Sequence, residues 1–252
     1  LGNAFVILHT SLFANHVAPV KVGEVLRPLM AVKHGLSTAD AVTTSVAARL
    51  FDVLSLVTIA SILGPVGVAL PHIPASGLIA LPLATVGSTA VGLVWLRSGR
   101  ALPWGPPRLK RIVAAFSDSL RSQPRSRLLG AAGVTLPSWV LEGTVVYVAA
   151  TSLGVGVSAQ AAVAATAFTL MFQMLHVTPG GIGVYEAAMT GALTAFGLSP
   201  SEALSVAVLA HSLKFAYSFT IALGLTLTTA RVLGWSPRSL PTRHLSMLAL
   251  LT

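Results

Sequence analysis

Residues 178–186 read TPGGIGVYE, and this stretch decides the expected fold. Its proline and glycines break a helix inside an otherwise apolar region, and a glutamate, Glu186, follows at once. Residues 18–24, APVKVGE, carry the same combination and end in Glu24. In both regions a glycine follows the glutamate by eleven residues. A repeat that carries carboxylates and helix breaks through hydrophobic sequence is typical of a transporter site at the middle of a membrane.

The composition predicts an all-α integral membrane protein, a polytopic helix bundle. The mean hydropathy is +0.82 and 9% of the residues are charged, whereas a soluble domain has about 25% charged residues. Residues 77–96 contain no charge, and Glu142 is the single charge in residues 128–151. Several such stretches disfavour the alternative of one buried helix in a large soluble protein. The chain has no cysteine, so neither disulfides nor thiolate metal sites are expected.

The positive charges are concentrated in one loop. Residues 97–127 hold eight Lys and Arg residues against Asp118, whereas residues 64–76 and 152–158 hold none. The positive-inside rule therefore predicts that loop 97–127 and the C-terminal tail are cytoplasmic. We expect a multi-pass protein of the plasma membrane, from a bacterium. An anionic lipid surface is the expected partner of this loop, and no nucleic acid is expected.

This orientation predicts two re-entrant hairpins. If loop 97–127 is inside, residues 159–197 form a broken-helix hairpin open to the outside, with its tip at 178–183. Residues 1–34 then form a hairpin open to the inside, with its tip at 18–23. Irregular backbone at that depth requires protein or a water-filled cavity around it. Each hairpin precedes a crossing helix, which gives an inverted-topology repeat; the expected crossings are 37–63, 77–96, 128–151 and 200–230.

We expect a single membrane domain over residues 1–252. Repeat one covers about 1–96 and repeat two about 128–252, with the basic loop between them. Leu1 lies within an apolar run, and the repeat offset predicts that a counterpart of the 128–151 helix precedes it. Apolar residues at helical spacing over 106–121 predict an amphipathic helix on the membrane surface, with a solvated connector as the alternative.

Four carboxylates fall at membrane depth, at Glu24, Asp52, Glu142 and Glu186. Each costs about 2.5–3.5 kcal/mol at the bilayer centre on insertion scales, so they require partners. Glu24 with Arg27, and Arg49 with Asp52, have the three-residue spacing of helical ion pairs. Such pairs serve either a binding site or helix packing alone. The candidate partners are Lys21, Arg27, Arg49, His176, His211 and Lys214.

The two broken helices suit an anionic headgroup. A helix that begins near the midplane exposes unpaired N–H groups and the positive end of its dipole, and arginine holds phosphate bidentately. His211 occupies the position of Arg49 in the repeat, although a lone histidine is as often a packing residue. Trp139 is expected either to pack or to line a cavity; Trp95, Trp104 and Trp235 are expected as interface anchors. The expected substrate-binding residues are Glu24, Arg27, Arg49, Asp52, Glu142, Gly180, Gly181, Gly183, Glu186, His211 and Lys214.

No catalytic motif is found. The sequence contains neither H-E-x-x-H nor G-x-S-x-G, and no Walker loop. We therefore expect no catalytic residues, no metal and no cofactor, and an ATP-driven pump acting alone is disfavoured.

Both regions resemble the signature blocks of the flippase-like membrane domain family, the transmembrane region of lysylphosphatidylglycerol synthase (multiple peptide resistance factor) and its stand-alone relatives. The first block has the family's N-x-x-x-P-x-x-x-G-E-x-x-R pattern at Asn15, Pro19, Gly23, Glu24 and Arg27, followed by R-x-x-D at Arg49 and Asp52. The second has P-G-G-x-G-x-x-E at Pro179, Gly180, Gly181, Gly183 and Glu186. His211 departs from the arginine expected in many relatives.

The resemblance covers most of the chain and implies translocation of a lipid between leaflets. That lipid is an aminoacylated phospholipid in the full-length synthase, and another lipid or a lipid-linked sugar in relatives. No part of the chain resembles the synthase's soluble aminoacyl-transfer domain, so no synthase activity is expected. The rival hypotheses are an intramembrane enzyme that modifies a lipid or polyprenyl phosphate, and a non-catalytic membrane subunit of a lipid or glycan transferase. A homodimer or a separate transferase is the expected protein partner.

Overall fold

The structure, a computed structural model, describes residues 2–18, 21–67, 87, 91, 94–95, 97–100, 103–174, 178–222 and 224–225. These residues form helices and connections without any strand, as the composition predicts. The expected crossing over 77–96, the tip residue Pro19, His176, Trp235 and the basic tail lie mainly or wholly outside the described residues.

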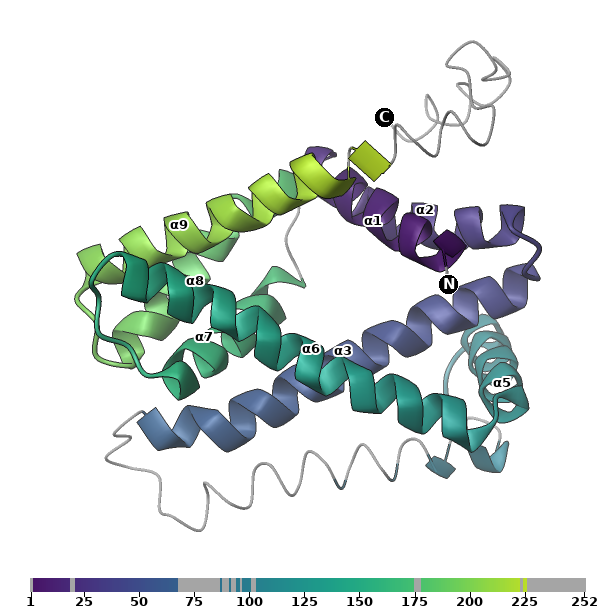
Figure 1. Ribbon diagram of the computed structural model, residues 1–252. Helices are drawn as coiled ribbons and strands as arrows, with labels where there is room; N and C mark the ends of the chain where they lie inside the picture. The colour runs from purple at the N-terminus through teal and green to yellow at the C-terminus, as the bar shows by residue number, and fades with distance from the viewer. Residues whose placement is uncertain are drawn as a thin grey trace.

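Among the residues that the structure describes, three helices are long and apolar enough to cross a membrane. They are α3 (Thr38–Gly67), α6 (Arg125–Ser152) and α9 (Pro200–Tyr217), which continues as the π-helix η2 (Ser218–Ala222). Their positions match three of the four helices expected as crossings, by length and composition. Figure 1 shows α3 and α6 running in the same direction and α9 running the opposite way.

The remaining helices are shorter. They are α1 (Gly2–Val17), α2 (Val22–Lys33), α5 (Pro107–Ser122), α7 (Ala159–Gln173), the 3₁₀ turn η1 (Pro179–Gly181) and α8 (Val184–Ala195). At about 1.5 Å per residue, α8 is about 18 Å long, well short of the roughly 30 Å apolar core of a bilayer. The amphipathic helix expected over 106–121 is present as α5.

Local structure repeats with the sequence. Helices α2 and α8 both have 12 residues, and each begins two residues before the glutamate of its repeat. A left-handed glycine follows each helix, Gly35 with φ +94° and Gly197 with φ +97°. Helices α3 and α9 both begin three residues after that glycine, each behind a serine whose hydroxyl meets an acidic side chain three residues on. The eleven residues from each glutamate to the following glycine therefore correspond to one short helix and the turn that ends it.

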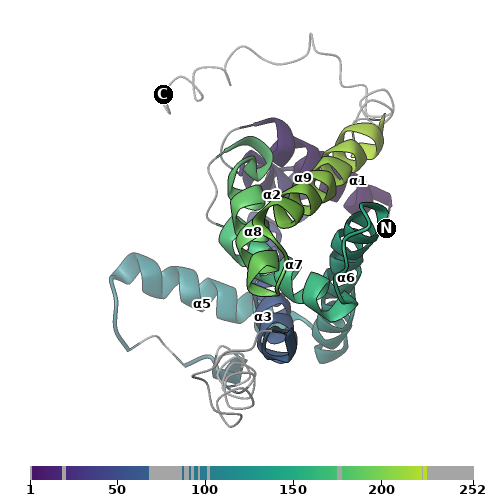
Figure 2. The ribbon, with the colours of Figure 1, turned by 90° about the vertical axis from the view of Figure 1, so that its left-hand side faces the viewer.

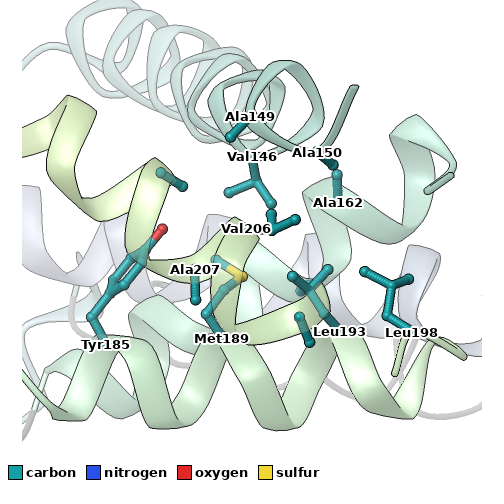
Figure 3. Close-up of a cluster of buried hydrophobic side chains, with 13 residues drawn as sticks. Val146, Ala149, Ala150, Ala162, Tyr185, Met189, Leu193, Leu198, Val206 and Ala207 are labelled. Atoms are coloured by element: carbon teal, nitrogen blue, oxygen red, sulfur yellow. The ribbon is translucent and has the colours of Figure 1, made fainter. Parts of the chain in front are cut away.

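Helix α7 lies at the centre of the bundle, against α3, α6 and α8 (Figure 2). Its alanines from Ala161 to Ala167 are almost fully buried. A side chain at Gly143 of α6 would meet the backbone of Val163 of α7 at 2.6 Å, so small residues let these helices pack closely. Tyr185, Met189 and Leu193 point from one face of α8 into the main buried cluster, to which α6, α7 and α9 also contribute (Figure 3).

Helix α1 packs on α2, on η1 and on the π-helix η2 that follows α9. His9 Nδ1 donates to the carbonyl oxygen of Phe5 at 2.8 Å, so its Nε2 accepts the Tyr217 hydroxyl at 2.8 Å. His16 contacts the Ser218 hydroxyl at 3.1 Å. These contacts join the first segment of the chain to the π-helix that follows α9.

Candidate functional site

The first polar cluster joins α2, α3 and α6. The Arg49 guanidinium forms a bidentate ion pair with Glu24, with Nε 2.8 Å from Oε2, and donates from Nη1 to Asp52 at 3.0 Å. Asp52 also accepts the indole N–H of Trp139 at 3.2 Å. The Glu24 and Asp52 side chains are 25% and 17% exposed, so both carboxylates are partly shielded but still reachable by a polar ligand.

A glycine and an asparagine position Glu24. A side chain at Gly23 would collide with the carbonyl oxygen of Ser11, so α2 packs directly on the backbone of α1. The Gly23 N–H donates to the Asn15 side chain at 2.7 Å and thereby satisfies one N–H group at the start of α2. Asn15 was not among the expected site residues, although it belongs to the quoted sequence pattern.

The pairing of Arg27 predicted from spacing is wrong. Glu24 pairs with Arg49 on the next helix, and Arg27 forms no hydrogen bond or ion pair with any residue that the structure describes. The predicted Arg49–Asp52 pair is confirmed. The reason is geometric, because Arg49 reaches both carboxylates at once across the α2–α3 interface. Arg27 thus makes no direct polar contact with these residues, although it lies close enough to Asp52 to attract its charge.

The second cluster repeats the first pair with a histidine. Glu186 of α8 and His211 of α9 meet at 2.6 Å between Oε1 and Nδ1, and Glu24 and Arg49 have the same separation of 25 residues in sequence. His211 Nε2 lies 3.1 Å from the Gly180 carbonyl oxygen, and the His211 side chain is 3% exposed. This carbonyl oxygen can only accept, so Nε2 carries a hydrogen. One further proton therefore lies between Glu186 and His211, on either the imidazole or the carboxyl group.

The glycines at the tip before α8 are required by its geometry. Gly180, Gly181 and Gly183 all have positive φ, at +61°, +79° and +85°. In this conformation the N–H groups of Gly181 and Gly183 already donate, to the Thr178 carbonyl oxygen at 3.0 Å and to Glu186 Oε2 at 2.7 Å. The carboxylate of Glu186 therefore occupies the helix N-terminus at which a phosphate was expected. A phosphate would have to displace it.

A further ion pair connects α6 to α9. Lys214 Nζ lies 2.6 Å from Glu142 Oε1 and 4.7 Å from the centre of the Tyr185 ring, which stacks on His211. Tyr185 is fully buried, and its hydroxyl has no hydrogen-bond partner among the described residues. No sequence motif marked Tyr185. The sequence signal that could have found Tyr185 is its position next to Glu186, in the first turn of the helix that follows the glycines.

Helix α6 links the two clusters. Trp139 contacts Asp52 of the first cluster, and Glu142, one turn later, contacts Lys214 of the second. Trp139 also packs against the buried cluster of α3 and α7, so it serves both expected roles of packing and polar contact. The expected site residues thus lie in two polar clusters that α6 connects. Arg27 lies beside the first cluster, and Gly181 and Gly183 lie in the turn before α8, next to the second. No group of three or more potential metal ligands occurs among the described residues.

These features define a polytopic helical membrane protein whose charged side chains pair within and between its apolar helices. Comparison with known protein families identifies the family of this membrane protein. The chain belongs to the family of the lysylphosphatidylglycerol synthase TM region, which matches residues 1–224.

A curated relative is the glycosyltransferase AglD of Haloferax volcanii, which is 29% identical over 132 residues. The match covers 47% of this chain and 21% of that protein's length. No solved structure matches this chain.

Proposed function

We propose that this protein translocates a lipid with a phosphate-containing headgroup between the leaflets of its membrane. The observation that carries the proposal is the repeated pair of a glutamate and a base, Glu24 with Arg49 and Glu186 with His211. Each glutamate lies in the first turn of a short helix that follows a break between two helices. Each base lies on the long helix that comes next. Paired charges on broken helices within apolar sequence are the usual construction of a midplane transport site.

The proposed arrangement in the membrane is an inverted-topology repeat. The α1–α2 and α7–α8 pairs act as re-entrant hairpins, because α8 and α2, with 12 residues each, are too short to cross. The opposite directions of α3 and α9 support opposite orientations of the two hairpins (Figure 1). Loop 97–127 lies on the cytoplasmic side in this arrangement, as its charge predicts.

In the proposed mechanism the headgroup competes with the carboxylates. A phosphate approaching the first cluster meets the unpaired Arg27 and can replace Glu24 on the guanidinium of Arg49, because both anions accept the same bidentate hydrogen bonds. At the second cluster it replaces Glu186 on His211 and on the N–H of Gly183. The carboxylates keep both clusters satisfied without substrate. Rocking of one half against the other, with the acyl chains in lipid, exposes the headgroup to each leaflet in turn.

Lipid scrambling in vesicles tests this proposal. The full chain is reconstituted with a fluorescent phospholipid, and loss of outer-leaflet fluorescence on adding a membrane-impermeant quencher is followed over time. Glu24→Gln and Glu186→Gln are each expected to slow translocation about tenfold or more, because without the competing charge of the carboxylate the headgroup is held more tightly and released more slowly. Glu202→Gln is the control, because Glu202 only closes the exposed cap at the start of α9. Unchanged rates in both site variants would refute the assigned site, and no translocation by the parent protein would refute the function.

A second candidate is a membrane subunit that presents a lipid-linked sugar to a glycosyltransferase. The name of the Haloferax volcanii relative favours it. It differs from an intramembrane enzyme acting on polyprenyl phosphate, which would form product from a lipid-linked donor when purified alone. Product formation that requires a co-purified transferase, together with no scrambling in vesicles, would favour the subunit.

A further inference from the structure

A basic groove runs along one face of α5, away from the two polar clusters. Its charged lining comprises Arg100, Lys110, Arg111, Arg121 and Asp118. The one carboxylate among them already forms an ion pair with Arg121. The lining therefore has a net charge of +3, with Arg100 and Arg111 free of hydrogen bonds from their side chains to the described residues.

A second chain segment closes the groove. Gly99, with φ +69°, lies so close to the Arg121 guanidinium that a side chain there would collide with it. At the other end, Lys110 Nζ donates to the Pro103 carbonyl oxygen at 3.5 Å. Arg97 reaches carbonyl oxygens at the end of α5, also at 3.5 Å. The cations are therefore gathered by tertiary contacts between two segments and are not merely a solvated stripe on one helix.

The groove lies at the level where two membrane spans begin. Helix α5 ends at Ser122, three residues before α6 begins, and Ser119 Oγ lies 3.4 Å from Asp40 in the first turn of α3. Figure 2 shows α5 running across the direction of α3. A helix that crosses the spans at their ends lies in the headgroup layer of the bilayer, parallel to its surface.

We propose that this groove binds the phosphate headgroup of an anionic phospholipid from the leaflet in which α5 lies. Arg100, Lys110 and Arg111 supply the charge-assisted hydrogen bonds, and Val113 and Ala114, which also line the groove, contact the apolar part of the lipid. A lipid is favoured over a soluble phosphate compound because the groove lies at the membrane surface and has apolar residues between its cations. This site is separate from the translocation site and holds whether or not the protein translocates lipid.

Binding of a short-chain phosphatidylglycerol to the purified full chain in neutral detergent tests the proposal. Lys110→Gln combined with Arg111→Gln is expected to weaken binding about tenfold or more, because charge-assisted contacts are lost. The matched control, Arg125→Gln with Arg127→Gln, removes the same charge from the same loop outside the groove, and about a twofold change or less is expected. The melting temperatures of both double variants are measured in the same detergent, and binding is compared between proteins whose melting temperatures agree.

A charge-preserving variant tests the geometry. Gly99→Ala leaves every charge in place, but φ +69° is strained for a residue with a side chain, so the segment that carries Arg100 shifts and severalfold weaker binding is expected. Equal losses in the groove and control double variants would show diffuse surface attraction and overturn the site, as would no loss in either. Displacement of the lipid by an equal concentration of inorganic phosphate would overturn the assignment to a lipid. Phosphatidylcholine, with no net charge, is expected to bind weakly to all of these proteins.

Discussion

Replacing His211 with phenylalanine measures how much the polar contacts of the second cluster stabilise the fold. Phenylalanine keeps a planar ring against Tyr185 and Phe215, with which His211 makes ring contacts. It removes both ring nitrogens, and with them the 2.6 Å contact to Glu186 and the 3.1 Å contact to the Gly180 carbonyl oxygen. The Gly180 oxygen keeps the Gln173 amide at 3.3 Å, but the carboxylate loses its one side-chain partner.

The expected loss in the free energy of unfolding is about 3 kcal/mol, of which the charge-assisted contact contributes about 2 and the neutral one about 1. Loss of one partner from a buried ion pair costs a similar amount, about 3–5 kcal/mol. Glu186→Gln is expected to cost about 1 kcal/mol or less, because the amide can donate to Nδ1 and accept from the N–H of Gly183. His211 then keeps its hydrogen on Nε2 for Gly180. The two variants of one pair therefore differ in stability, although each removes one partner.

Thermal unfolding in a mild detergent measures this difference, with an expected fall in Tm of roughly 10 °C for His211→Phe at about 2–4 °C per kcal/mol. The double variant is expected to lose less than the sum of the single losses, because an uncharged amide at position 186 no longer requires a cationic partner. A His211→Phe protein as stable as the parent, or a Glu186→Gln protein that is the less stable of the two, would refute the assignment of hydrogens in this pair.

Three further outcomes follow from single side chains. Gly143→Ala places a methyl group 2.6 Å from the backbone of α7 and is expected to cost about 1–3 kcal/mol of stability, whereas Gly133→Ala on the same helix has open space and should be neutral or stabilising, as melting temperatures will report. Trp139→Phe removes the N–H donor to Asp52 but keeps most packing; a stability loss of about 1 kcal/mol is expected, together with slower scrambling, and a faster rate would contradict the link through α6. Arg27→Gln should change stability by less than about 0.5 kcal/mol, since Arg27 makes no hydrogen bond or ion pair with the described residues, yet slow scrambling; a stability loss without a transport defect would reverse its role.

The long helices were predictable from the sequence because their hydrophobicity and end signals are local. Glycine followed by a capping serine precedes both α3 and α9 and is a local signal for both helix starts. The short α8 was also predictable, since its glycines and proline break the chain before it. The pairing of Glu24 was not, because spacing along one helix favoured Arg27, while the partner lies on another helix.

The residue order alone is enough to assign the protein to the helical membrane proteins and to show which charged residues fall within its apolar segments. Apolar stretches without charges specify helices that bury their backbone hydrogen bonds in lipid, and the repeat marks which carboxylates are equivalent. Tertiary structure decided which charges neutralise one another, that His211 and Gly180 share a hydrogen bond, and that α6 contacts both clusters. The reason is that an ion pair between helices depends on their relative position and rotation. These follow from close packing at small residues such as Gly23 and Gly143, which no spacing within one helix reports.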